Sequence, residues 1–485
     1  MKAPLCSRAA AWSRREFLNR TGMGLGRFGL ASVLQQAGLG AAESFVSPLS
    51  SRSPHFAPKA KRIIQIFCEG GPSQVDTFDP KPMLSKYHGK PVDEVMKDFT
   101  KTAGEVASGM GRLSGKLQQS GFTFSKHGQC GAEISELFPK LAGHADDLCI
   151  VRSMHTKSSV HEPAQLMTNT GELTVVRPSV GSWIVYGLGT ENQNLPAFVA
   201  LHPNGTTSSG DKNWSNAFLP SWTRGTGIAT KNPSVEKLIE NLRSGSTSIR
   251  EQRRQLDLLA EMNADFLEDH PGDAYLEGRV LSFETAFRMQ VEATDAFDLQ
   301  REPLPVRELY GDTEQGRQML LARRLVERGV RFVQVWHTGW DTHDENDSRH
   351  KTLCEAADQP VAALLQDLKN RDMLKDTLVI WGGEFGRTPT SDNNDVAKKK
   401  GIGRDHNAGG YSLWMSGGGI KGGLTHGSTD DFGAVAQENP VDVHDFHATV
   451  MNLMGFDHER LTYRYAGRDF RLTDVYGKVV KDLLA

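Results

Sequence analysis

The sequence predicts an α/β protein in which a mostly parallel β-sheet is covered by helices on both faces. Short apolar runs of strand length alternate along the chain with segments that are apolar at helical spacing. Polar and glycine-rich segments follow several of the apolar runs, at the edge where open parallel sheets bind ligands. With 485 residues, of which 38% are hydrophobic, the chain is long enough to bury a large core.

The predicted elements follow one another from residue 62 to the C-terminus. Apolar runs that stop at glycine, proline or polar clusters predict strands, and longer amphipathic segments with few helix breakers predict helices. A Gly/Lys-rich stretch, 83–131, is expected to be irregular. The predicted strands are 62–68, 148–152, 196–201, 330–336, 377–381 and 411–415, and the predicted helices are 133–141, 313–328, 353–369, 444–454 and 475–484.

The middle of the chain, about 234–299, predicts a helical insertion. Three segments there are charged and apolar at helical spacing, with few breakers: 234–242, 249–267 and 276–297. We expect this insertion to pack within its own domain, and a role in assembly is the less favoured alternative.

The first residues resemble an export signal. Ser13-Arg14-Arg15-Glu16-Phe17-Leu18 precedes a weakly apolar, glycine-rich stretch and a small-residue site at Gly40-Ala41-Ala42, the pattern of a twin-arginine signal. Residues 1–42 are therefore expected to be removed by export through the twin-arginine translocase, followed by a linker, 43–61, and one domain, 62–485. No other apolar run is long enough to span a bilayer, so we expect a periplasmic or secreted mature protein with no membrane span.

Charge and cysteine content exclude some functions. Lys and Arg number 56 against 59 Asp and Glu, so the formal net charge of −3 provides no electrostatic surface for binding nucleic acid. The cysteine spacings match no zinc motif and no C-x-x-C pair, and Cys68 and Cys149 lie in strand-like runs that predict buried thiols.

Polar clusters that follow the predicted strands are the main functional signal. Aspartate and neutral histidine are the ligands preferred by Zn, Mn and Fe, whereas calcium prefers oxygen alone. Any single histidine here is as readily a solvated residue as a ligand, but five such strand-end segments together predict a metal or catalytic site. The segments contain Ser73, Asp76 and Asp79; Ser153 to His161; His337, Asp341 and His343; Glu384, Arg387, Arg404, Asp405 and His406; and His426.

Several motifs resemble a known bacterial family. They are Cys68-Glu69-Gly70-Gly71-Pro72-Ser73-Gln74-Val75-Asp76-Thr77-Phe78-Asp79-Pro80-Lys81-Pro82, Arg152-Ser153-Met154-His155 with His161, Gly339-Trp340-Asp341-Thr342-His343, Gly383-Glu384-Phe385-Gly386-Arg387-Thr388-Pro389, Gly403-Arg404-Asp405-His406 and Gly467-Arg468-Asp469-Phe470. From about Lys61 to the C-terminus the chain resembles the family of domain of unknown function 1501. That family is similar to a branch of the alkaline-phosphatase-like superfamily, which also contains sulfatases.

The resemblance implies an alkaline-phosphatase-like core with two divalent metal sites for Zn, Mn, Fe or Ca. By chain order the implied ligands are Asp76, Asp341, His343, Asp405, His406 and His426. Glu69 is a rival for the first ligand, because it lies nearer the strand end, and His337 and His350 are substitutes for His343. The later Asp445 and His447 fit a packing helix better than a ligand set.

The resemblance also implies hydrolysis of phosphate or sulfate esters by a metal-activated hydroxyl or by hydroxide. A metal stabilises an alkoxide that is otherwise scarce at neutral pH. Ser153, Thr156, Ser158 and Ser159 are candidate nucleophiles, and His161 is a candidate general acid or ligand. Arg152, Arg387 or Arg404 are candidates to bind a tetrahedral oxyanion. No C-x-P-x-R or S-x-P-x-R motif is present, so a formylglycine-type sulfatase is not expected.

Two function classes remain open from the sequence. The favoured one is an exported hydrolase acting on a small anionic ester or on a sulfated or phosphorylated glycan. The alternative is a non-catalytic binding protein on the same fold, for anionic polysaccharide, suggested by Trp214 and Trp222 as surfaces for sugar rings. Packing of these tryptophans in a core or loop is the favoured explanation of the pair.

Overall fold

The computed structural model describes residues 49–95, 113–203, 207–232, 234–238, 248–269, 280, 283–288, 295–391 and 401–485. The export signal predicted over 1–42 and most of the helix predicted over 276–297 lie outside these residues.

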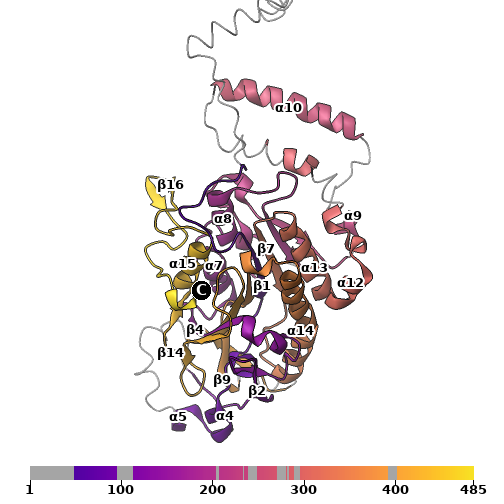
Figure 1. Ribbon diagram of the computed structural model, residues 1–485. Coiled ribbons are helices and arrows are strands. Elements are labelled where there is room, and N and C mark those ends of the chain that lie inside the picture. The colour runs from indigo at the N-terminus through magenta and orange to yellow at the C-terminus, as the bar shows by residue number, and fades with distance from the viewer. Residues whose placement is uncertain are drawn as a thin grey trace, which may run out of the picture. The chain divides into compact units, whose positions relative to one another are not determined.

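Nine strands of the described residues form one largely parallel sheet (Figure 1). Their order is β12-β4-β11-β8-β1-β7-β5-β6, and β15 pairs with β4 beside this path. Only β11 runs against its neighbours, because it is antiparallel to both β4 and β8 while every other pairing is parallel. The strands are β1 (Arg62–Cys68), β4 (Leu148–His155), β5 (Phe198–His202), β6 (Thr226–Ala229), β7 (Phe332–His337), β8 (Thr377–Gly382), β11 (Tyr411–Ser416), β12 (Leu424–His426) and β15 (Val441–Asp442).

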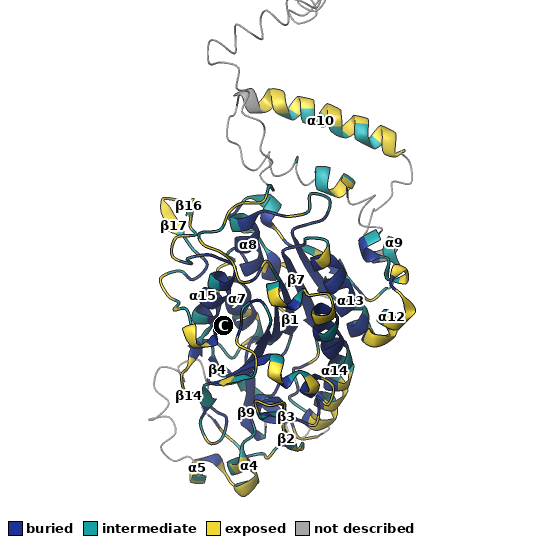
Figure 2. Ribbon diagram, viewed as in Figure 1, coloured by how far each residue is buried: buried dark blue, intermediate teal, exposed yellow. Residues whose placement is uncertain are grey.

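Both faces of the sheet are buried, which explains why the strands are almost continuously apolar. Within β1, Ile64 and Ile66 belong to the core formed with α13 (Glu314–Glu327) and α14 (Asn346–Asn370). Ile63 and Phe67 point the other way, into the core formed with α8 (Val180–Leu188) and α15 (Val443–Leu453). Figure 2 shows the strands as the most deeply buried part of the fold. The predicted α/β fold with helices on both faces of a largely parallel sheet is confirmed.

Local sequence explains where the covering helices begin. Thr313 precedes α13, and its hydroxyl accepts a hydrogen bond from the Gly316 amide at 3.0 Å, which satisfies one of the free donors of the first turn. Asp442 does the same for α15, because its carboxylate accepts from the His444 amide at 2.8 Å.

Two predicted helices are wrong. The segment 133–141 contains a strand, β3 (Ala132–Ser135), paired with β2 (Phe124–His127), and then a 3-10 turn, Leu141–Asp147. Its buried apolar residues, Ala132 and Ile134, are two positions apart, so their period is two rather than 3.6. The segment 475–484 contains only a 3-10 turn, Lys481–Leu483, and its Gly477 has a φ of +91°, outside the helical region.

Other predictions are confirmed with different ends. The predicted strand 196–201 is β5, and the predicted helix 353–369 is part of α14, which begins seven residues earlier at Asn346. The antiparallel ribbon of β9 (Gly386–Ser391) and β10 (Arg404–Asn407) is not among the predicted elements. The smaller elements are α3 (Gln74–Thr77), α4 (Pro82–Lys86), α5 (Val92–Val95), α7 (His161–Thr170), α9 (Val235–Leu238), α10 (Ile249–Asp269), α12 (Leu304–Tyr310), β13 (Ser428–Thr429), β14 (Ala436–Glu438), β16 (Tyr463–Tyr465) and β17 (Arg468–Phe470).

The helix predicted over 249–267 is present as α10. Its described side chains are exposed or half-buried, as the yellow and teal helix of Figure 2 shows. That 234–299 forms an insertion with its own packing stays a prediction.

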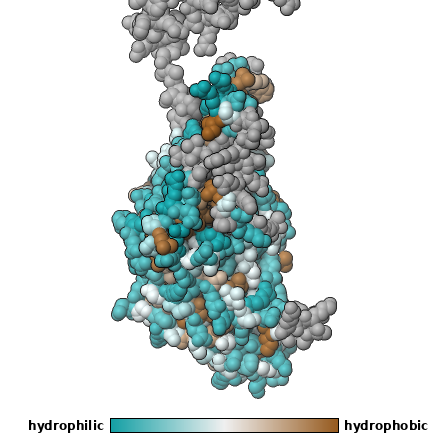
Figure 3. Space-filling model, turned by 90° about the vertical axis from the view of Figure 1, so that its right-hand side faces the viewer, coloured by the Kyte–Doolittle hydropathy of each residue, from teal (hydrophilic) through white to brown (hydrophobic). Residues whose placement is uncertain are grey.

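Where described residues are visible in Figure 3, the surface is mostly hydrophilic and its hydrophobic residues lie in small separate patches. Among the described residues, no helix combines the length and the apolar character needed to cross a bilayer.

Stability of this fold should fall as the pH drops from about 6.5 to about 4. Burial lowers the pKa of His447 to about 4, and the hydrogen bond between its Nε2 and the Thr168 carbonyl, at 2.8 Å, offsets this only in part. Between these pH values the unfolded chain binds a proton that the native histidine does not, so the free energy of unfolding decreases by up to roughly 3 kcal/mol. Urea unfolding at several pH values measures this dependence.

The matched variants are His447→Gln, which removes the titrating ring, and His88→Gln at an exposed position. We expect a shallower loss of stability with acid for the first and the wild-type pH dependence for the second. Equal pH dependence in all three proteins would contradict the assignment.

Candidate active site

The carboxyl ends of the parallel strands bring the predicted polar segments to one edge of the sheet. Asp341 follows β7, Glu384 follows β8, and His161 is the first residue of α7, which follows β4. The β9–β10 ribbon adds His406, which pairs in register with Arg387. Residues far apart in the sequence thus meet above the sheet.

One group of side chains consists of His343, Asp405 and His406. The Nε2 atoms of His343 and His406 lie 2.9 Å apart, and His343 Nδ1 is 3.8 Å from Asp405 Oδ1. These three residues can each offer one ligand atom, with all three atoms within 4.8 Å of one another. Their side chains keep contact with solvent, since those of His343 and Asp405 are 35% and 45% exposed.

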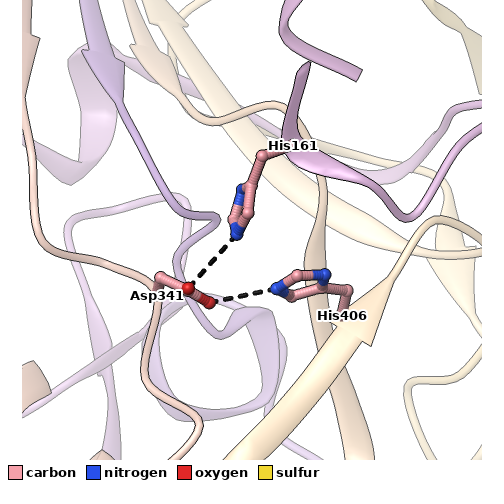
Figure 4. A group of neighbouring side chains, drawn as sticks. All are labelled: His161, Asp341 and His406. Atoms are coloured by element: carbon pink, nitrogen blue, oxygen red, sulfur yellow. Dashed lines mark hydrogen bonds and ion pairs between the residues drawn. The ribbon is translucent and has the colours of Figure 1, made fainter. Parts of the chain in front are cut away.

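Asp341 connects this group to His161. Its Oδ1 atom lies 3.0 Å from the Nε2 atoms of both His343 and His406, and its Oδ2 atom lies 3.3 Å from His161 Nε2. Figure 4 shows the rings of His161 and His406 directed at this one carboxylate. His161, Asp341 and His406 therefore form a second possible ligand group, which shares His406 with the first.

His161 is oriented by a buried carboxylate. Its Nδ1 atom is 2.7 Å from Glu384 Oε1, and Glu384 is fully buried. The amide of Gly70 donates to both oxygens of Glu384, at 3.0 and 3.2 Å. The other ring nitrogen, Nε2, is buried and lies 3.3 Å from Asp341 Oδ2. Glu384 lies in a strand-end segment, but its partner is 223 positions away, so the sequence alone does not mark it as a site residue.

Arg387 fixes the orientation of the Asp341 side chain. Its guanidinium is fully buried, and Nη2 donates to Asp341 Oδ1 at 2.7 Å and to the carbonyl oxygens of Gly70 and Trp340. Nε donates to Gly71 O and Nη1 to Arg404 O. With its donors engaged in this way, Arg387 positions Asp341 rather than presenting a fork to a bound anion.

Glycine permits the close approach of these loops. Gly70 has a φ of +111°, and a Cβ there would lie 2.3 Å from the Asp341 amide nitrogen. A side chain at Gly70 would therefore push the loop that carries Asp341 away from β1.

The electrostatics of the site favour a charged Asp341 and a neutral His406. Burial tends to raise the pKa of Asp341, but hydrogen bonds from His161, His343 and His406 and the Arg387 charge outweigh it and lower that pKa strongly. Burial lowers the pKa of His406, and the nearby Arg387 and His161 add to this effect, while Asp341 opposes it.

His161 behaves in the opposite way. Burial tends to lower its pKa, but hydrogen bonds and the negative charges of Asp341 and Glu384 raise it to about 9. A cation bound at Asp341 would cancel the contribution of that carboxylate.

The residues around His406 fit a divalent cation. His406 Nδ1 donates to the Ser159 carbonyl at 2.7 Å, so in the neutral ring the lone pair is on Nε2, the atom that faces His343 and Asp341. Arg387 competes with a cation for Asp341 Oδ1, so His343, Asp405 and His406 are the primary ligand candidates and Asp341 the additional one. Two imidazoles with carboxylates suit Zn, Mn or Fe better than Ca.

Two of the predicted metal ligands lie elsewhere. Asp76 is buried and accepts from Arg404 Nε at 2.8 Å and from Ser73 Oγ at 2.5 Å. Burial opposes ionisation of Asp76, yet Arg404 and His350 keep its pKa below the ordinary value. His426 lies on β12, paired with β4, and belongs to neither ligand group.

His337 and His350, the predicted alternatives to His343, belong to neither ligand group. His350 is buried, with its Nε2 accepting from the Ser73 amide at 2.9 Å, and His337 is buried at the end of β7. The Nε2 atom of His343 itself lies 2.9 Å from that of His406. Glu69 remains at the end of β1, where its Oε1 accepts from Gln165 and Ser208.

The predicted hydroxyl nucleophiles have other surroundings. Ser153 donates to the Asn439 carbonyl at 2.6 Å, and Ser158 accepts from the Val160 amide at 3.1 Å. Thr156 is only 1% exposed, and Ser159 supplies the carbonyl that binds His406. This loop therefore contributes backbone to the site, through the Ser159 carbonyl.

The remaining predicted residues have packing roles. Arg404 is buried, and its Nη atoms donate to carbonyl oxygens of Thr388, Gln118 and Gln119. Arg152 Nη2 donates to the Glu133 carbonyl at 3.3 Å. Trp214 is buried, with its ring stacked on His202 and edge-on to Trp336, and Trp222 lies half-buried beneath Arg52.

Solved structures similar to this chain have very different sequences. Ps i-CgsB is 10% identical with a TM-score of 0.37, over 82% of this chain and 73% of its own. The PsFucS1 sulfatase from Pseudoalteromonas sp. is 12% identical with a TM-score of 0.34, over 89% and 72%. A protein in the alkaline phosphatase superfamily from Vibrio parahaemolyticus is 9% identical with a TM-score of 0.35, over 89% and 75%. At these TM-scores the likeness assigns neither a reaction nor a substrate.

Sequence comparison identifies the family. None of the curated proteins compared with this sequence matches it. The family described as "Protein of unknown function (DUF1501)" matches residues 60–484, most of the chain, and the chain therefore belongs to that family.

Proposed function

We propose that this protein is an exported, metal-dependent hydrolase of phosphate or sulfate esters. The observation that carries the proposal is the convergence of His343, Asp405 and His406, in which the Ser159 carbonyl leaves the His406 Nε2 lone pair free. A divalent cation bound there would supply a Lewis acid for the ester oxygens. Export rests on the predicted twin-arginine signal, which lies outside the described residues.

The protein side chains have separate tasks in this proposal. His343, Asp405 and His406 hold the cation, and Asp341 adds a carboxylate whose orientation is held by Arg387. The partly exposed carboxylates of Asp341 and Asp405 place this group where a substrate from solvent can reach it. His161, oriented by Glu384, lies 3.3 Å from Asp341 and is the candidate general acid for the leaving group of the ester. The substrate class is a small anionic ester or a sulfated or phosphorylated glycan.

The second expected metal site has less support. The two ligand groups share His406, so among the described residues they do not form two independent sets. We therefore propose one cation at His343, Asp405 and His406, with Asp341 and His161 at its side.

Metal content tests the ligand set. After chelation and reloading with Zn²⁺ or Mn²⁺, the wild-type protein should retain a stoichiometric cation after gel filtration, measured by elemental analysis. His406→Gln should weaken binding at least about tenfold, because it removes the ligand nitrogen that both groups share. His426→Gln is the matched control and should bind as the wild type does. Equal retention by His406→Gln, or loss only in His426→Gln, would refute the ligand set.

Hydrolysis tests the reaction class. With 4-nitrophenyl phosphate and 4-nitrophenyl sulfate as probes, the metal-loaded protein should release nitrophenol, and the chelated protein should not. Asp405→Asn should reduce kcat/KM by about a hundredfold or more, because it removes a negatively charged ligand from the group. If the loaded protein hydrolyses neither probe nor any phosphorylated or sulfated glycan, the proposal fails, and a binding protein on this fold becomes the better reading.

A further inference from the structure

A cleft of about 700 Å³ lies between α12, α13 and the 3-10 turn Leu299–Arg301. Figure 1 shows α9, α12 and α13 on the same side of the molecule, and Val235 of α9 lines the cleft as well. The volume is within the range of about 300–1,000 Å³ that is typical of binding sites for small organic molecules. None of the described residues that line it belongs to the ligand groups of the candidate active site, so the cleft is a separate site.

The wall of the cleft is largely aliphatic. Leu320 of α13 is 3% exposed and belongs to the core on this face of the sheet, and Leu299 and Val235 pack against that core. Leu304, at the start of α12, also lines the cleft and is 57% exposed, so the aliphatic lining reaches solvent. The described lining residues include no aromatic ring, and the wall therefore suits an aliphatic chain rather than the face of a sugar ring.

Arg307 gives this cleft a positive charge with no carboxylate partner among the described residues. The residue is half-buried, and its Nη1 atom donates to Gln300 Oε1 at 2.5 Å. Its Nε atom is buried and has no hydrogen-bond partner, so Nη2 is the donor left for a ligand. A guanidinium beside apolar walls is stabilised by an anion, because the anion accepts charge-assisted hydrogen bonds that compensate for lost hydration.

The three carboxylates among the described lining residues have other partners or face solvent. Asp298 Oδ2 lies 3.5 Å from Arg301 Nε. The Asp312 side chain is 99% exposed and lies 3.2 Å from Arg317 Nη1, and Glu308 is exposed. Water and salt screen such exposed charges, whereas a half-buried guanidinium is screened less. An anion is therefore the ligand that completes the electrostatics of the cleft.

We propose that this cleft binds a single-chain amphiphilic anion. Its carboxylate or phosphate head contacts Arg307 Nη2, and its aliphatic chain lies along Leu299, Leu304 and Leu320. Fatty acids and alkyl phosphates share this chemistry, because a guanidinium pairs with either head group while the aliphatic wall requires the chain. The inference is independent of the proposed hydrolysis, since the cleft and the candidate active site have no described residue in common.

Isothermal titration of the whole wild-type protein with decanoate, decyl phosphate and 1-decanol, all below micelle formation, is the primary test. At least one of the two anions should bind at one saturable site, at least about tenfold more tightly than the alcohol, because only the anions pair with Arg307. The anion that binds more tightly identifies the head group. Acetate and inorganic phosphate, which lack the chain, should not displace it. Equal binding of the alcohol and the anions, or no saturable binding, would overturn the inference.

Variants locate the binding in the cleft. Arg307→Gln should weaken binding of the decyl anion at least about tenfold and leave binding of 1-decanol unchanged, because it removes only the charge. Leu304→Ser, at an exposed position, should weaken binding of anion and alcohol alike, because it shortens the aliphatic wall. The matched control is Arg464→Gln on β16, which breaks an ion pair with Asp469 of 3.2 Å outside the cleft and should bind as the wild type does. Wild-type affinity of Arg307→Gln, or equal weakening by Arg464→Gln, would refute the site.

The outcomes also separate this inference from the proposed function. Arg307 belongs to neither ligand group, so the metal-loaded Arg307→Gln protein should hydrolyse 4-nitrophenyl phosphate as the wild type does. Saturable binding that depends on Arg307 supports the cleft whether or not the protein hydrolyses esters, and hydrolysis without such binding overturns the cleft alone. Circular dichroism of each variant shows whether a loss of binding comes from unfolding.

Discussion

The buried guanidinium of Arg387 is the constraint on which the site depends. A charge removed from water is tolerated only when its donors are satisfied, and breaking such an arrangement costs about 3–5 kcal/mol. Arg387 meets this condition by donating to the carbonyl oxygens of Gly70 and Gly71 after β1, of Trp340 after β7 and of Arg404 on β10, and to the Asp341 carboxylate. One side chain thus holds three loops together at the carboxyl edge of the sheet.

The arrangement of the cluster follows from that constraint. With Oδ1 held by Arg387, Asp341 turns Oδ2 toward His161, and the ribbon that carries Arg387 and Arg404 also carries His406. A second buried pair, Arg404 with Asp76, fixes the other side of the same ribbon at 2.8 Å. Structural arginines therefore surround the proposed chemistry, and their charges have carbonyl and carboxylate partners within the protein rather than in a substrate.

The residues of the proposed site differ in how close they lie to the reacting atoms. His343, Asp405 and His406 are proposed to bind the cation, His161 to act as the general acid, and Asp341 to connect the two. Glu384 and Arg387 act one step further away, through His161 and Asp341, and both are fully buried. Burial of the positioning residues and partial exposure of the ligands is the arrangement that keeps a site rigid and still open to a substrate.

The order of residues in the sequence was sufficient to predict the strands and the polar residues that lie close together in the chain. Apolar runs such as 330–336 and 377–381 reveal strands because both faces are buried, and Asp341, His343, Asp405 and His406 were identified because they directly follow strands or lie in one short motif. The helix predicted around Ala132 and Ile134 is wrong, because a run of only a few residues fits the strand period of two and the helix period of 3.6 equally well. Folding alone decided which polar groups meet: Arg404 pairs with Asp76, and Glu384 binds His161 Nδ1. The reason is physical, because a buried charge is paired with whichever partner the chain topology brings within about 3 Å, and partners separated by 328 or 223 residues leave no periodic trace in the sequence.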